Sequence, residues 1–139
     1  MAVTIRCLLT SPRQVAGMLY GLQLASEAQL RERPYPPLYR SGVRYVPEPY
    51  GQENWQIPSV TLQLRGGDCE DLAAWRAAEL VVSGADPRAR AVVKIVRPGL
   101  MHCIVLRGNG RREDPSRLLG MRDHGGPSRA NGRLLLWAA

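Results

Sequence analysis

Gly66-Gly67-Asp68-Cys69-Glu70-Asp71 opens the part of the sequence that decides the fold, and Leu72-Ala73-Ala74-Trp75-Arg76-Ala77-Ala78-Glu79-Leu80 follows directly. Paired glycines are typical of a tight turn. The apolar residues after them recur at helical spacing, which predicts a helix from Cys69 to about Val82, ended by Ser83-Gly84. The cysteine therefore belongs to the first turn of a helix, where the backbone contributes about half a positive charge.

Further elements are predicted on both sides of this helix. Ser11-Pro12 joins an N-cap residue to a proline at the first helical position, and the apolar spacing after it predicts a helix ending near Arg33-Pro34. The segment 35–58, rich in proline and tyrosine, predicts an ordered loop with a short strand at 43–46, followed by a helical turn at 60–64. We expect strands at 3–9, 90–97, 100–107, 111–114 and 134–137, a short helical turn at 115–119 and a glycine-rich loop at 123–132.

Composition narrows the class of protein. The 139 residues, 45% hydrophobic and 22% charged, predict one globular domain, 1–139. The net charge is +7, but the arginines are spread along the chain without a long basic run, so we expect a solvated surface rather than nucleic-acid binding. Residues 1–10 do not have the pattern of a signal peptide, and no apolar run approaches the length of a membrane span. We therefore expect a cytoplasmic location and no membrane partner.

The three cysteines, Cys7, Cys69 and Cys103, do not predict a disulfide framework or a structural zinc site, because their number is odd and no Cys-x-x-Cys occurs. We interpret Cys7 and Cys103 as small apolar strand residues. Cys69 is the candidate nucleophile, and we expect the helix terminus and a nearby imidazolium to lower its pKa. Its neighbours Asp68, Glu70 and Asp71 oppose that shift, and act either as helix caps or as ligands of a cation or substrate.

A histidine and an aspartate complete the candidate site. His102 lies on a predicted strand, on the opposite face from Cys103, and a rigid strand suits a general base better than the loop that carries His124. Asp114 follows twelve residues after His102, beyond one glycine turn, so we expect it on a neighbouring strand. There it accepts a hydrogen bond from the imidazole, or else only starts the turn at Pro115. Glu113 should point to the other face.

The order Gly67-Asp68-Cys69-Glu70-Asp71-Leu72-Ala73, a histidine on an apolar strand and Asp-Pro resembles the transglutaminase-like superfamily, and most of all bacterial transglutaminase-like cysteine proteinases and their small phage-encoded relatives. The resemblance covers about Trp55 to Met121. It implies a papain-like α+β fold, with the cysteine helix packed on a small antiparallel sheet. It also implies that Cys69 is the nucleophile, His102 the base and Asp114 the orienting acid.

The remaining parts of the site are assigned by analogy. The backbone N–H of Cys69 is the natural first oxyanion donor. Gln63 matches the spacing of the papain-type glutamine, and Trp55 is the alternative by analogy with animal transglutaminases. No cofactor is expected, unless calcium binds as in some relatives, which would map to Asp68 and Glu70.

These residues predict a cysteine peptidase or amidase, which attacks a protein or peptide substrate through its thiolate and forms an acyl-enzyme. The triad is shared with protein-crosslinking transglutaminases, in which an amine replaces water, and that alternative stays open. A second alternative is a non-catalytic phage assembly protein that retains the fold, lies in the virion and binds an assembly partner. Nucleic-acid binding ranks last, because it depends on charge alone.

Overall fold

The computed structural model describes residues 3, 5–49, 52–122 and 134–135, with side chains described up to residue 122. Within these ranges the helices are α1 (Pro12–Glu32), η1 (Leu38–Arg40, a 3₁₀ turn), α2 (Pro58–Leu64), α3 (Cys69–Val82) and α4 (Pro115–Leu118). The strands are β1 (Arg44–Tyr45), β2 (Gly66–Gly67), β3 (Arg90–Arg97), β4 (Leu100–Leu106), β5 (Arg112–Glu113) and β6 (Leu134–Leu135).

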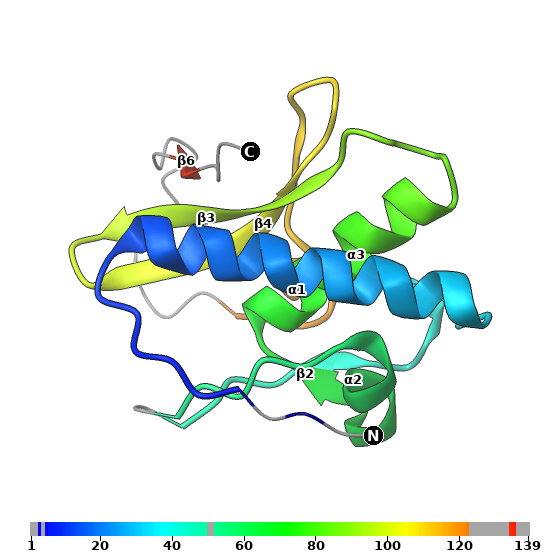
Figure 1. Ribbon diagram of the computed structural model, residues 1–139, viewed down its shortest axis with the longest axis horizontal. Helices are drawn as coiled ribbons and strands as arrows, with labels where there is room; N and C mark the ends of the chain where they lie inside the picture. Colours follow the sequence, from blue (N-terminus) through cyan, green and yellow to red (C-terminus); the bar gives the residue numbers. More distant parts are fainter. Residues whose placement is uncertain (1–2, 4, 50–51, 123–133, 136–139) are drawn as a thin grey trace.

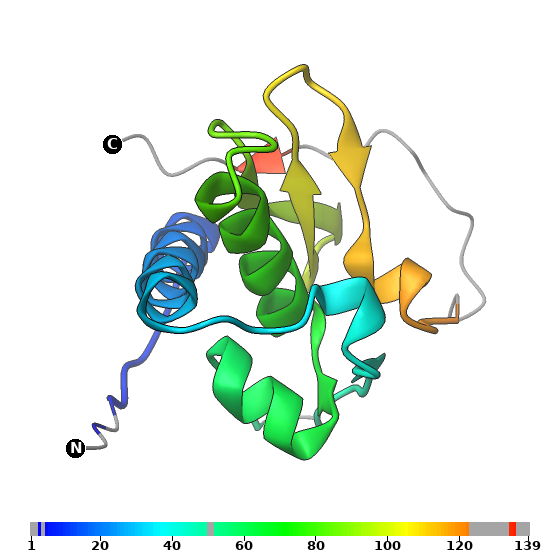
Figure 2. The same ribbon diagram turned by 90° about the vertical axis from the view of Figure 1, so that its right-hand side faces the viewer.

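The larger sheet has the strand order β5-β4-β3-β6, with each neighbouring pair antiparallel. Its centre is the hairpin of β3 and β4, which begins at the pair Arg90 and Leu106 and turns at Gly99, whose φ is 75°. Helices α1 and α3 lie side by side and cover one face of this sheet (Figures 1 and 2). The molecule is therefore an α+β protein with helices packed on a small antiparallel sheet, as the sequence predicts.

The small alanine side chains on α3 allow the two helices and the sheet to pack closely. The core cluster between α1, α3 and the hairpin consists of Ala16, Leu19, Ala73, Ala74, Ala77, Leu80, Ala89, Ala91, Val93, Cys103 and Val105. A second cluster joins the other side of α3 to η1 and to the residues next to β1 and α4, and consists of Leu38, Val43, Leu72, Trp75 and Leu119. Full burial of a Leu side chain contributes about 1.5–3 kcal/mol, so both sides of α3 are firmly held.

The glycine pair of the opening motif forms β2, which runs parallel to β1 in register Arg44 with Gly66 and Tyr45 with Gly67. A Cβ at Gly66 would lie 2.5 Å from Cγ2 of Val46, and one at Gly67 would lie 3.0 Å from Cγ2 of Thr61. Glycine is therefore required here by close approach rather than by an unusual φ. This tight passage fixes the point at which Cys69 starts α3.

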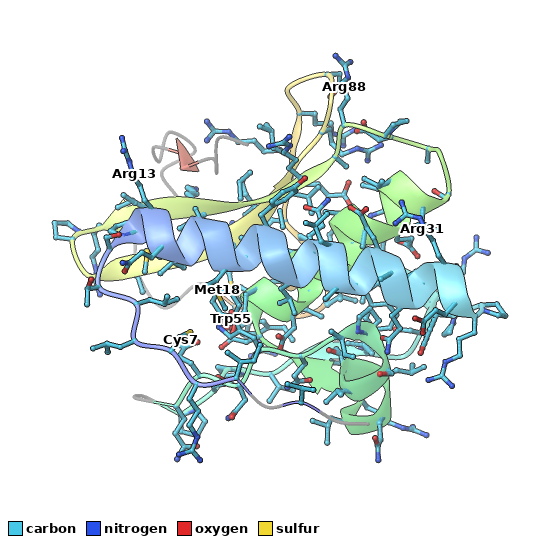
Figure 3. All side chains as sticks on the ribbon, in the orientation of Figure 1. Cys7, Arg13, Met18, Arg31, Trp55 and Arg88 are labelled. Carbon is cyan, nitrogen blue, oxygen red and sulfur yellow. The ribbon has the colours of Figure 1, made fainter. Side chains whose placement is uncertain are left out.

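The strand predicted at residues 3–9 is wrong. The described residues of this segment have no regular structure, and the side chains of Ile5 and Leu8 are 77% and 86% exposed. Figure 1 shows the segment running from the start of α1 towards α2, away from the sheet, so it has no strand to pair with. Cys7 is exposed for the same reason, which corrects its interpretation as a buried strand residue (Figure 3).

The other predicted elements are present, with β1, β5 and α4 shorter than expected. The loop predicted at 123–132, with His124, and the end of the strand predicted at 134–137 lie outside the described residues. In the part of the chain that the structure describes, no helix is long and apolar enough to cross a membrane. Arg13, Arg31 and Arg88 point away from the body of the molecule (Figure 3).

Candidate active site

Cys69 is held by a capping box at the start of α3. Asp68 is the N-cap residue, and its Oδ1 accepts the N–H of Cys69 at 2.5 Å. Oδ2 of Asp71 accepts the N–H of Asp68 at 3.0 Å, and its Oδ1 accepts the N–H of Gln56 at 2.7 Å. Both acids are therefore caps, and Asp71 also ties the preceding loop to the helix. In this arrangement the N–H of Cys69 is already used, so it is not a free oxyanion donor.

His102 and Asp114 are brought together by the sheet. His102 lies on β4, and Asp114 follows β5, which pairs with β4. Nε2 of His102 lies 2.9 Å from Oδ2 of Asp114, with both side chains partly buried. Asp114 is also the N-cap of α4, because its Oδ1 accepts the N–H of Arg117 at 3.3 Å. The two roles considered for Asp114 are thus compatible.

The imidazole of His102 also interacts with the thiol of Cys69. Burial lowers the pKa of His102, but the hydrogen bonds with Asp114 and Cys69 outweigh burial and raise it to about 9. Burial raises the pKa of Asp114, and the hydrogen bond with His102 overcomes it, so that the pKa is lowered. At neutral pH the pair is therefore imidazolium and carboxylate. Cys69, His102 and Asp114 are brought into one line of contacts.

Cys103 changes the electrostatics of the nucleophile. It faces the helix layer as a small buried residue, as predicted, but Cys69 packs against the same cluster and the two thiols meet. Contact with Cys103, together with burial, raises the pKa of the Cys69 thiol well above its ordinary value, although His102 lowers it. The sequence prediction of a lowered pKa is wrong for this structure, because the thiol–thiol contact is a tertiary feature.

Glu70 is the second neighbour of the sulfur. Its side chain is only 4% exposed, and its Oε2 accepts a hydrogen bond from the Cys69 thiol at 3.3 Å. Burial raises the pKa of Glu70 to about 11, with smaller contributions from the negative charges at Cys69, Asp68 and Asp71. Glu70 is therefore an uncharged carboxylic acid at neutral pH. It does not oppose ionisation of the thiol as a charged residue would.

Asp68 and Glu70, to which calcium would map, do not fall in one group of possible metal ligands among the described residues. Among the described residues, oxygens of Glu48, Glu53 and Glu70 lie within 4.8 Å of one another, whereas Asp68 is used by backbone N–H groups of Cys69 and Glu48. Glu48 and Glu53 come from the loop before α2, and no spacing in the sequence connects them to Glu70. Calcium prefers carboxylate oxygens, and of these three residues Glu70 is uncharged at neutral pH.

The two side chains proposed as oxyanion donors have different surroundings. Trp55 is partly buried against the core cluster that also receives Cys69, and its Nε1 donates to Oε2 of Glu53 at 3.3 Å. Gln63 is exposed on α2, and in the described part of the chain it has no hydrogen bond with Cys69. Trp55 is therefore the better placed of the two.

A network of charges around Glu113 holds the site together. Oε1 of Glu113 accepts from Nε of Arg76 at 2.7 Å and from the Tyr39 hydroxyl at 2.5 Å, and Oε2 accepts from Nη1 of Arg107 at 2.9 Å. Glu113 thus points away from His102, as predicted, and connects β5 to α3 and η1. An open depression of about 440 Å³ lies beside it, lined by Arg76, Arg111, Arg112, Glu113, Asp114, Arg117 and Leu118. Sequence reasoning missed this role of Arg76, because its partners come from distant segments.

Comparison of the chain with protein-family models, with curated proteins and with solved structures finds no match.

Proposed function

We propose that this protein is a transglutaminase-like cysteine peptidase or amidase, built on a papain-like core. The observation that carries the proposal is the line of contacts from Cys69 through His102 to Asp114. An acid, an imidazole and a thiol in this order form the arrangement that activates a sulfur nucleophile. The resemblance of the Gly-Asp-Cys-Glu-Asp motif supports the same assignment.

The chemistry proceeds in two halves. Catalysis starts from the fraction of molecules in which His102 is neutral: the thiol proton passes to the imidazole, which becomes imidazolium, and the sulfur attacks the carbonyl carbon of the scissile amide. The imidazolium then returns the proton to the nitrogen of the leaving amine, the C–N bond breaks and an acyl-enzyme remains. Water attacks the thioester with His102 as base, which releases the acid and restores the thiol. Asp114 holds the imidazole in place through its contact with Nε2 throughout.

In the resting enzyme, Cys69 is a thiol rather than a thiolate. Because Glu70 is uncharged and His102 is protonated, the charges around Cys69 favour ionisation, while the contact with Cys103 opposes it. Trp55 Nε1 is the donor proposed for the oxyanion, after it leaves Glu53. The arginines that line the depression beside Asp114 suit a substrate segment with acidic residues.

The test uses a peptide library and an electrophilic peptide probe, with release of new amino termini and probe labelling followed by mass spectrometry. Wild type should cleave and should be labelled at Cys69, while Cys69→Ser and His102→Ala should lose both signals and Cys7→Ser should keep them. A fluorescent primary amine added to the same reaction separates hydrolysis from crosslinking, because a transglutaminase would incorporate it. If the probe labels Cys7 and Cys103 as strongly as Cys69 and no peptide is cleaved, the peptidase proposal is contradicted. The non-catalytic assembly protein is then the alternative that stays open.

A further inference from the structure

A second set of ligand-type side chains surrounds the same sulfur. The Sγ atoms of Cys69 and Cys103 and a carboxylate oxygen of Glu70 lie within 4.8 Å of one another. Two of these residues come from the first turn of α3 and the third from β4. Glu70 and Cys103 are only 4% and 5% exposed, whereas Cys69 is partly exposed and gives access from solvent.

Glu70 carries an unexplained polar atom in this cluster. Its Oε1 is buried and has no hydrogen-bond partner among the described residues, while Oε2 meets the Cys69 thiol. A buried polar atom without a partner costs about 1–3 kcal/mol, so such an atom in a protein needs a reason. A bound cation would supply the missing partner.

We propose that this cluster is a zinc site, in which the sulfurs of Cys69 and Cys103 and the carboxylate of Glu70 bind one Zn²⁺ and thereby block the nucleophile. Zinc accepts thiolate and carboxylate ligands at about 2.0–2.3 Å, and three protein ligands with an open fourth position are a common set. Ligands at those bond lengths lie roughly 3.5–4 Å apart in a tetrahedron, so the three atoms need only small shifts.

The donor set selects this metal over calcium. Thiolates are soft ligands that calcium does not use, whereas zinc binds them strongly. The carboxyl cluster of Glu48, Glu53 and Glu70 also contains Glu70, but it offers oxygen ligands alone and lacks the two sulfurs that select zinc. Binding of zinc by these residues does not depend on the proposed function. Only the claim that zinc blocks catalysis rests on the proposed function.

The experiment titrates the reduced, metal-free protein with Co²⁺ and follows the thiolate-to-cobalt charge-transfer band in the near ultraviolet. Wild type and Cys7→Ser should reach a plateau at one equivalent, Zn²⁺ should remove the band and excess Ca²⁺ should not. Cys103→Ala and Glu70→Gln should each bind Co²⁺ at least about tenfold more weakly, since even outer partners of a metal contribute that much. Circular dichroism confirms that each variant is folded, and Glu48→Gln serves as the matched acidic control that keeps the band.

Absence of a thiolate band in wild type, or a band unchanged in Cys103→Ala, overturns the zinc site. Zn²⁺ should also protect Cys69 from iodoacetamide, and labelling at an unchanged rate in saturating Zn²⁺ would contradict the blocking. These outcomes separate the two proposals, because the band requires no substrate. Cleavage without a band removes only the zinc site, and a band without cleavage removes only the peptidase.

Discussion

Removal of Cys103 should make Cys69 more reactive. Contact with Cys103 is the largest cause that raises the pKa of the Cys69 thiol, and His102 remains beside the sulfur when Cys103 is replaced. Cys103→Ala therefore lowers the pKa of Cys69 and increases its thiolate fraction at neutral pH.

The expected rate follows from two opposing effects. At a pH below both pKa values, each unit by which the pKa falls gives about ten times more thiolate. A less basic thiolate is also less nucleophilic, with a Brønsted coefficient of about 0.4–0.5, which leaves a net gain of about threefold for each unit. Alkylation of Cys69 at pH 7 should therefore be faster in Cys103→Ala than in wild type.

The assay measures alkylation of Cys69 by iodoacetamide from pH 5 to 10, in a chelator to keep metals away, with peptide mass spectrometry to separate the three cysteines. Cys7→Ser is the matched control, because Cys7 is exposed and has no role at the site. Cys103 is buried, so thermal unfolding must show that the variant remains folded. Equal or slower alkylation of Cys69 in folded Cys103→Ala, with an unchanged pKa, would refute the reasoning.

The other predictions concern stability, measured by urea unfolding. Glu70 has a pKa of about 11 in the fold against an ordinary 4.5, so it stabilises the fold below pH 4.5 and destabilises it increasingly above. Wild type should lose up to about 1.4 kcal/mol for each pH unit from 5 to 9, and Glu70→Gln should remove most of that slope; parallel pH profiles would contradict this. The pKa of His102 is raised to about 9 from 6.5, so its pair with Asp114 stabilises fully below pH 6.5 and fades as pH rises through 9. Asp114→Asn should cost about 1–3 kcal/mol at pH 6 and clearly less at pH 10, and an equal cost at both would exclude the charged pair. Gly66→Ala should destabilise by about 1–3 kcal/mol because its Cβ meets Val46, and Val46→Ala in the same chain should recover part of it. If Val46→Ala restores no stability to the Gly66→Ala chain, the steric conflict at residue 66 does not involve Val46.

Local signals predicted the helices well. Ser11 and Asp68 cap α1 and α3 with their own side chains, so the start of each helix depends on residues within one turn. The Pro98-Gly99 turn likewise sets the hairpin of β3 and β4, because its conformation is decided inside the turn. The positions of Cys69 and His102 within these elements follow directly.

Features that depend on distant partners were missed. Residues 3–9 have the composition of a strand, but a strand needs a neighbour to pair with, and the segment runs away from the sheet. The meeting of Cys69 with Cys103, and of Glu70 with the loop glutamates, depends on how α3 lies on the sheet. The pKa of Cys69 was therefore predicted in the wrong direction, although the contacts of His102 with Cys69 and with Asp114 were expected.

The central claim is that Cys69, His102 and Asp114 act as one unit, and titration of the His102 ring by NMR tests it most directly. Spectra of wild type, with assignment from His124→Gln, should give His102 a pKa of about 9. Cys69→Ala should lower that value, and Asp114→Asn should lower it further towards 6.5, because each removes a hydrogen bond that favours the imidazolium. A pKa near 6.5 in wild type, unchanged in both variants, would contradict the account.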